Sequence, residues 1–362
     1  MSRLLLSLRV RCSAMSATLL LRLFALALLL CSATLPAASD AIGPLSGPAA
    51  QPGRHVLLLA YDLQNGGIAK TARGFLSAAH YLGWQVAVID GQGDAALVRK
   101  TLRSSAAAAS IAGVAFFGGD SKAFHAELTA LDKAGKVLVG WHAGEMPGPN
   151  GELFTNVTTD PVAVAQAAVD YALQTSSGPI GAVIFTDSTF AIAMRKAHVM
   201  QTALQHCKRC KVLAVEDVKI ATVAHTLPAL IVQLNARYGF AWTHNFAIND
   251  IYFDNISFPL YRLGRQDLVN IAAGDGSSLA IRRIRLGLSQ QKASIAEPCD
   301  QQGWQAADEM NRAFAHQPPS GYLSRPILIT EASLADAGEG GDVEPNTAYR
   351  KRYLAIWLQR AP

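Results

Sequence analysis

Short apolar runs alternate along this chain with segments in which apolar residues recur at helical spacing. The first clear unit lies at residues 54–94. An apolar run at 56–60 leads into a polar, glycine-containing loop at 61–67, and apolar residues then recur at helical spacing as far as Leu82. A second apolar run at 85–90 completes a strand-loop-helix-strand pattern. Because the runs lack polar alternation, we expect strands buried on both faces, as in a parallel sheet covered by helices.

The same alternation continues to residue 173 and restarts at residue 181, which predicts two similar α/β halves. We expect further strands at 111–117, 137–140, 181–185, 212–215, 246–248, 268–272, 293–296 and 326–330. We expect further helices at 95–105, 122–134, 161–173, 191–206, 225–238, 279–286, 302–316 and 349–358. The last helix gathers Tyr349, Tyr353 and Trp357 on one face, so it should dock on one of the halves.

The segment 1–39 has the pattern of a secretory signal peptide. Four arginines and no acidic residue accompany an uninterrupted apolar run at 23–30, and small residues follow it. This run is shorter than the ~20 residues that a membrane span needs. We expect cleavage before Asp40, with cleavage before Ile42 and a start at Met15 as open alternatives. The chain should therefore be exported.

Removal of this segment changes the electrostatic character of the chain. The full sequence has a formal net charge of +5, of which the signal segment supplies four arginines and no acidic residue. The mature chain is therefore close to neutral, and we expect no nucleic-acid partner. Residues 40–53 contain Gly, Pro and Ser without periodicity, which predicts a disordered leader to the first strand.

Three cysteines remain in the mature chain, namely Cys207, Cys210 and Cys299. A zinc finger would need a second pair of ligands at finger spacing, and a haem attachment site would need His after the second Cys. In an exported protein a local disulfide between Cys207 and Cys210 is the better interpretation, at the predicted turn between a helix and a strand. Cys299 is then expected to be a buried thiol.

Several motifs resemble one known family when they are taken in order. They are GFLSAAHYLGW at 74–84, TNVTTDP at 155–161, AINDIYFD at 247–254, AAGDG at 272–276 and ASIAEP at 293–298. Together they resemble the periplasmic sugar-binding proteins of ABC importers, which are type I solute-binding proteins. The resemblance covers residues 54–334, and the signal segment stands where DNA-binding repressors with the same lobes carry a helix-turn-helix.

The resemblance implies a particular architecture. It implies an α/β fold of two Rossmann-like lobes with parallel sheets, joined by a three-stranded hinge and enclosing the ligand between them. The first lobe would comprise 54–158 with 298–324, and the second lobe 159–297 with 325–334. Residues 335–362 would form a C-terminal tail and helix.

The resemblance also implies a set of ligand-binding residues at strand ends. They are Asn65, Trp141, His142, Phe190, Arg195, Asn249, Asp275 and Glu297. Such residues supply the hydrogen-bonding groups and aromatic faces that sugar recognition requires. An Asn at a strand end is also a frequent helix N-cap, and this alternative stays open for Asn249. Asp275 lies between two glycines that leave the backbone open to a close ligand.

The chain departs from the family pattern at two positions. Gly66, Gly67 and Ile68 stand where the first loop of the family usually offers aromatic residues. Trp141 and His142 stand where the family usually has Asp and Arg. We therefore expect the aromatic contact to come from Trp141, and a ligand that differs from the family's common hexoses and pentoses.

The resemblance implies a function without catalysis, cofactor or metal. The protein would be the periplasmic solute-binding component of an ABC importer, a monomer that binds a carbohydrate or polyol and delivers it to the permease. One alternative is a ligand-sensing protein read by a chemoreceptor or histidine kinase. An alternative of another class is a secreted hydrolase with its active site in the cleft. Gly119, Asp120 and Ser121 resemble a lipase motif, but Lys122 replaces the Leu of that motif.

Overall fold

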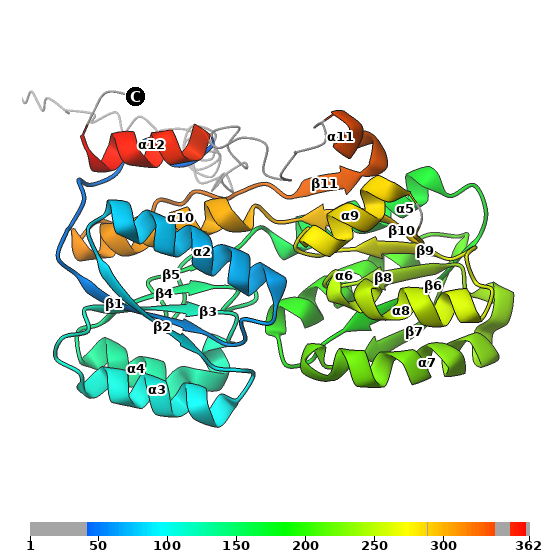
Figure 1. The fold of residues 1–362 in the computed structure, drawn as a ribbon, viewed down its shortest axis with the longest axis horizontal. Helices are drawn as coiled ribbons and strands as arrows, with labels where there is room; N and C mark the ends of the chain where they lie inside the picture. The colour runs from blue at the N-terminus through cyan, green and yellow to red at the C-terminus, as the bar shows by residue number, and fades with distance from the viewer. Residues whose placement is uncertain (1–41, 288, 337–347, 360–362) are drawn as a thin grey trace, which may run out of the picture. The chain divides into compact units, whose positions relative to one another are not determined.

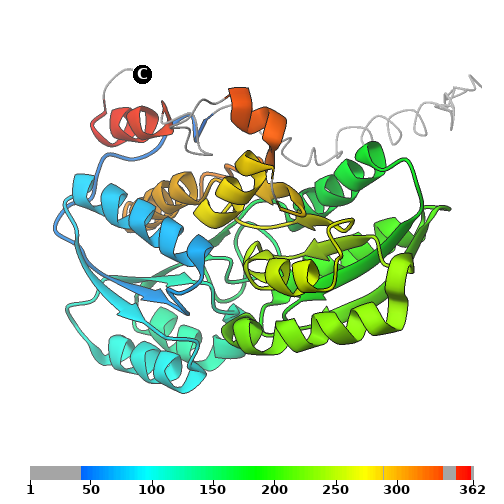
Figure 2. The same cartoon turned by 45° about the vertical axis from the view of Figure 1, so that its right-hand side comes forward.

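The computed structural model describes residues 42–287, 289–336 and 348–359. The predicted signal peptide and most of the acidic stretch before the last helix lie outside these residues. The described residues belong to one compact unit that contains two separate β-sheets (Figure 1 and Figure 2). Within this part of the chain, none of the helices has the length and apolar character that a membrane span requires.

The first sheet has the strand order β2-β1-β3-β4-β5, and all of its neighbouring strands are parallel. Its strands are β1 (His55–Ala60), β2 (Gln85–Asp90), β3 (Gly113–Phe117), β4 (Val137–Trp141) and β5 (Thr155–Val157). Helices α2 (Gly66–Tyr81) and α10 (Cys299–Phe314) cover one face, and α3 (Ala95–Ala107) and α4 (His125–Lys133) cover the other (Figure 1).

The apolar run in β1 shows why this sheet is buried on both sides. Successive side chains of a strand point to opposite faces. Val56 and Leu58 therefore join the core beneath α2 and α10, whereas Leu57 and Leu59 join the core with α3 and α4. A strand with two buried faces needs apolar residues at every position, which is the pattern that the sequence shows at 56–60.

The second sheet has the order β11-β10-β9-β8-β6-β7, in which only β11 is antiparallel to its neighbour. Its strands are β6 (Ile180–Thr186), β7 (Cys210–Asp217), β8 (His244–Ala247), β9 (Val269–Ala272), β10 (Gln291–Ala296) and β11 (Ile327–Thr330). The helices around it are α5 (Pro161–Thr175), α6 (Ala191–Gln205), α7 (Val223–Tyr238), α8 (Ile251–Arg262), α9 (Ser278–Leu286) and α11 (Glu331–Asp336). Helix α5 packs against α6, and α7 packs against α8.

The chain passes between the two sheets three times, after β5, after β10 and before β11. The second passage brings α10 from the C-terminal part of the chain onto α2 from the N-terminal part. Their backbones touch at two glycines. A Cβ atom on Gly74 would lie 2.4 Å from the carbonyl oxygen of Asp300, and one on Gly303 would lie 2.3 Å from that of Thr71. Larger side chains at these two positions would force the helices apart.

Residues 42–53 differ from the expected disordered leader. The backbone N–H of Ala50 donates to the carbonyl of Trp357 at 3.0 Å, and that of Gln51 donates to the Asn311 side chain at 2.9 Å. The segment lacks periodicity because it forms neither a helix nor a strand. Its backbone N–H groups donate to distant elements instead. Composition alone therefore misread it as disordered.

The C-terminal helix α12 (Ala348–Trp357) docks on α10 of the first lobe. The indole of Trp357 stacks on that of Trp304 with 5.5 Å between ring centroids, and its N–H donates to Asp308 at 2.7 Å. Tyr349 and Tyr353 are buried on the same face. The aromatic face that the sequence predicted for this helix is therefore the face that packs on α10.

The predicted disulfide between Cys207 and Cys210 is confirmed. It closes the turn between α6 and β7, with 5.2 Å between the two Cα atoms. Cys299 is buried at the first position of α10.

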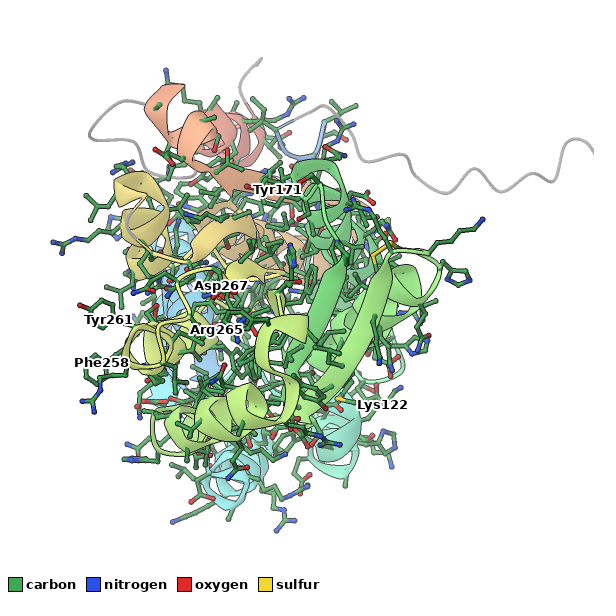
Figure 3. The ribbon with its side chains drawn as sticks, turned by 90° about the vertical axis from the view of Figure 1, so that its right-hand side faces the viewer. Lys122, Tyr171, Phe258, Tyr261, Arg265 and Asp267 are labelled. Carbon is green, nitrogen blue, oxygen red and sulfur yellow. A yellow bond between two sulfur atoms is a disulfide. The ribbon has the colours of Figure 1, made fainter. Side chains whose placement is uncertain are left out.

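The outer side of the second lobe exposes two aromatic residues of α8. Figure 3 shows Phe258 and Tyr261 projecting outward from this helix, and both are exposed. The turn that follows is fixed by the buried Arg265, whose guanidinium binds Asp267 at 2.8 Å and the carbonyl of Trp242 at 2.6 Å.

Candidate functional site

A small cavity lies where the carboxyl ends of strands from both sheets meet, which is where ligands bind in open α/β sheets. Its volume is about 40 Å³. Six of the eight residues predicted from the sequence line it, namely Asn65, Trp141, His142, Phe190, Asn249 and Asp275. Lys196 and several apolar residues complete the lining. Residues that are up to 210 positions apart in the sequence, from Asn65 to Asp275, thus share one cavity.

Asn65 begins helix α2. Its side-chain oxygen accepts hydrogen bonds from the backbone N–H groups of Gly67 and Ile68, at 3.0 and 3.2 Å. This is the geometry of a helix N-cap. Because the cap uses the oxygen, the amide N–H groups of Asn65 are left to donate to a ligand.

Trp141 and His142 end strand β4, and their rings stack in parallel with 3.8 Å between centroids. The indole N–H of Trp141 donates to the side-chain oxygen of Gln302 in α10 at 2.7 Å, and the residue is 2% exposed. Trp141 therefore lines the cavity while it is held in the core, and its role as the aromatic contact to a ligand stays a prediction. Truncating it would leave a large void and would remove the donor to the side-chain oxygen of Gln302.

His142 has a backbone φ of 49°, in the left-handed region that residues other than glycine rarely adopt. This conformation costs on the order of 1 kcal/mol and is retained at functional sites. It turns one ring nitrogen toward Glu297, at 2.8 Å.

Glu297 lies directly behind the cavity, at the passage from β10 to α10. One carboxylate oxygen accepts a hydrogen bond from the ammonium of Lys196 at 2.8 Å, and the other contacts His142. Burial alone would raise the pKa of Glu297, but His142 and Lys196 outweigh it and hold that pKa well below the ordinary value. The three residues come from the second passage, α6 and β4, so the ion pairs connect both lobes at the hinge.

Asp275 follows strand β9 and faces the cavity from the second lobe. The amide of Asn249 donates to both of its carboxylate oxygens, at 3.0 and 2.8 Å. Burial, followed by the nearby carboxylate of Asp250, raises the pKa of Asp275 to about 7, although Lys196 opposes this. Asn249 also accepts the backbone N–H of Ile251 at 2.9 Å, so it serves both as a cap and as a site residue.

Asp250 fixes the loop that carries Asp275. Its carboxylate accepts hydrogen bonds from the backbone N–H groups of Gly276 and Ser277, at 2.8 and 3.2 Å, and from the Ser294 hydroxyl at 3.0 Å. It is fully buried. Asp250 is therefore a positioning residue, and it is not among the residues predicted from the sequence.

Gly67 explains why the first loop lacks the aromatic residues expected there. A Cβ atom at this position would lie 2.9 Å from the Asp275 carboxylate. A side chain at position 67 would push Asp275 away, so the close approach of Asp275 to the N-terminus of α2 requires a glycine here.

Arg195 was predicted as a ligand-binding residue, but the structure places it outside the cavity. It is exposed, and it lines a separate surface depression with His198 and His206. The next residue, Lys196, points into the cavity and is 3% exposed. Lys196 lies on the same face of α6 as Ala193 and Met200, both buried, and that apolar periodicity was the signal that could have identified it.

Tyr252 of the AINDIYFD motif lies in the core. Its hydroxyl donates to the carbonyl of Val218 at 2.7 Å, and the residue is fully buried. Among the residues that the structure describes, no cluster of three or more His, Cys, Asp or Glu side chains is arranged to hold a metal ion. The groups in the cavity are suited to hydrogen bonding with hydroxyls, with carboxylate and amide acceptors beside ammonium and amide donors.

Comparison with known proteins identifies the fold. No family model matches this chain, and no curated protein matches it. A sugar ABC transporter protein from Yersinia enterocolitica subsp. enterocolitica 8081 is similar with a TM-score of 0.71 and 14% identity, over 85% of this chain and 96% of that chain. The Caulobacter myo-inositol binding protein bound to myo-inositol has a TM-score of 0.68 and 18% identity, over 80% and 97% of the respective chains.

A third similar structure is an ABC transporter solute binding protein from Agrobacterium vitis with bound allitol. It has a TM-score of 0.69 and 12% identity, over 78% of this chain and 97% of that chain. The predicted fold class is therefore confirmed: the chain has the two-lobed α/β fold of type I periplasmic binding proteins.

Proposed function

We propose that this protein is exported to the periplasm and binds a carbohydrate or polyol between its two lobes as the solute-binding component of an ABC importer. The observation that carries the proposal is the cavity itself. Asn65, Asn249, Asp275 and Lys196 bring hydrogen-bonding groups from both lobes to one point at the carboxyl ends of the strands. Proteins of the same fold hold allitol and myo-inositol.

The proposal requires the lobes to separate. The cavity of about 40 Å³ has room for about three water molecules. A sugar cannot enter it without a movement of the lobes. We propose that residues 54–158 with 298–324 move against residues 159–297 with 325–334, and that the ion pairs of Glu297 form at the pivot. Neighbouring permease and ATPase genes would favour import over sensing.

Calorimetric titration with a panel of sugars and polyols tests the proposal. At about pH 8, where Asp275 is ionised, Asp275→Ala should weaken binding by about 100-fold or more, because each hydrogen bond from a ligand hydroxyl to a carboxylate contributes roughly 1.5–3 kcal/mol. Asp132→Ala, which removes an exposed carboxylate of the first lobe, should leave the affinity unchanged.

Two results would contradict the proposal. Steady turnover of a bound compound would indicate a hydrolase. A lower melting temperature of Asp275→Ala with unchanged affinity would show that Asp275 only stabilises the loop before α9.

A further inference from the structure

A second and larger cavity adjoins the first on its outer side. Its volume is about 230 Å³. It shares Asn65, Ile68, Phe190 and Ile220 with the inner cavity, so the two are separated only by these side chains. Like the inner cavity, it lies between loops of both lobes, and its own lining includes Tyr61 from the end of β1.

Two aromatic rings form a wall of the outer cavity. Tyr61 of the first lobe and Phe190 of the second lobe meet edge to face, with 5.8 Å between ring centroids and 82° between ring planes. Aromatic rings pack on the apolar faces of sugar rings, and Tyr adds a hydroxyl at the wet end. The inner cavity shares Phe190 with this wall and is also lined by Trp141, so aromatic faces are available in both cavities.

Polar groups face the same space. Lys219 and Thr189 line this cavity, and the Lys219 ammonium donates to the hydroxyls of Ser188 and Thr189, at 2.9 and 3.1 Å. Asp62 accepts the backbone N–H of Gln64 through one oxygen, and its other oxygen is directed toward the glycine at position 93. A side chain at Gly93 would narrow this space.

The sizes of the two cavities indicate how a ligand would occupy them. The inner cavity holds about three water molecules and the outer one about fifteen, so the outer cavity offers most of the space for a ligand. Asn65 lines both cavities, and because the helix cap uses only its side-chain oxygen, its amide N–H groups are left to donate to a ligand.

We propose that the outer cavity is a second binding subsite, and that the ligand is a hydroxylated compound longer than a single ring, such as a glycosylated polyol or a disaccharide. One end would reach Asp275 and Lys196 in the inner cavity, and the second unit would lie against Tyr61 and Phe190. This inference rests on the proposed function and specifies its class of ligand.

Titration calorimetry with matched pairs of compounds tests the inference. Each pair joins a single unit with its glycoside: myo-inositol with galactinol, sorbitol with maltitol, and glucose with maltose. For any pair that binds, the longer member should bind the wild-type protein at least about tenfold more tightly. Tyr61→Ala should remove this preference while changing the affinity for the shorter member by less than about twofold.

Two further variants complete the experiment. Ala221→Trp fills the outer cavity from an exposed position, so it should abolish the preference without an effect on the fold. Tyr81→Ala removes an exposed tyrosine of α2 and should change neither affinity. Melting curves of all variants establish that they are folded.

The outcomes separate the two proposals. Equal or tighter binding of the shorter member in every pair that binds would overturn the second subsite and leave the proposed function intact. An equal loss of affinity for both members of a pair in Tyr61→Ala would show that Tyr61 affects only the closure of the lobes, and would also overturn the second subsite. If no compound of a broad panel binds, both proposals are overturned together.

Discussion

At the scale of single residues, the two neighbouring carboxyl groups of Asp250 and Asp275 have different tasks. Asp250 is satisfied by hydrogen bonds from its own lobe, whereas Asp275 is buried with Asn249 as its donor and has a pKa raised to about 7. Since an unfolded Asp titrates near pH 3.9, the folded protein holds this proton more tightly than the unfolded chain. Its stabilising contribution is complete below about pH 3.9 and is lost as the pH rises through 7.

Asp275→Asn replaces the carboxyl group by an amide that cannot ionise. We therefore predict that, in the absence of ligand, the melting temperature of this variant rises relative to that of the wild type as the pH increases from about 4 to about 7. Above about pH 7 the difference should become constant. Glu309, whose pKa burial also raises to about 7, is present in both proteins and cancels in the comparison. A difference in melting temperature that is independent of pH would contradict the prediction.

Lys196 and Arg195 form a natural matched pair for a second prediction. Lys196→Met leaves Glu297 buried without its ammonium partner, so it should destabilise the protein by roughly 3–5 kcal/mol. Arg195→Met alters an exposed position and should change the free energy of unfolding by less than about 0.5 kcal/mol. Urea unfolding measures both, and equal effects would show that the ion pair with Glu297 contributes little.

At the scale of elements, the disulfide fixes one turn and closes a very short loop. Chain-entropy stabilisation depends on the length of the closed loop, so the loss in Cys207→Ser with Cys210→Ser should be about 2 kcal/mol or less. The disulfide lies at the end of α6 and the cavity lies at its beginning, so ligand affinity should be unchanged. Chemical unfolding and titration of this double variant check both statements. A loss well above 3 kcal/mol, or a weaker affinity, would mean that the turn positions α6 as a whole.

The helices α2, α10 and α12 show how one element depends on another. Helix α10 joins the first lobe by contact of its backbone with α2 at Gly74 and Gly303, and α12 then covers Trp304 on its outer side. The acidic residue at the start of α10, Asp300, also binds Tyr349 and Arg350 of α12. The C-terminal helix is thus attached close to the passage that carries Glu297.

At the scale of the whole molecule, the proposed function requires an equilibrium between open and closed lobes. A ligand that binds only the closed form stabilises it by mass action, by about 2.7 kcal/mol at a concentration of 100 Kd. We predict that a ligand lowers the radius of gyration measured by solution X-ray scattering and raises the melting temperature. Asp275→Ala at the same ligand concentration should show neither change. A radius of gyration that stays constant at saturation would exclude closure as the binding mechanism.

The sequence by itself determined most of the strands and helices, although it did not predict β5 (Thr155–Val157), α8 (Ile251–Arg262) or α11 (Glu331–Asp336). In a strand buried on both faces every position must be apolar, so runs such as 56–60 and 113–117 mark buried strands. The run 85–90, for which the same burial was expected, is the edge strand β2 and is largely exposed, because it has a neighbour on one side only. Residues near the carboxyl ends of strands, including Asn65, His142 and Asp275, were predicted from the resemblance to a known family, and the shared edge of parallel strands explains why they lie around one cavity. The disulfide followed from two cysteines separated by only two residues.

Only the tertiary structure decided which groups meet in the cavity. Successive residues of a helix point about 100° apart, so an error of one position exchanged exposed Arg195 for buried Lys196. Trp141 is an aromatic residue at a strand end, as expected of a binding residue. Its hydrogen-bond partner Gln302 lies 161 positions away in the sequence, and this contact holds the Trp141 ring in the core. Residues 42–53 are ordered by α10 and α12, and Gly67 is required by Asp275 of the other lobe. A local sequence pattern cannot identify such distant partners, because the burial and the charge environment of these residues depend on groups that only folding brings together.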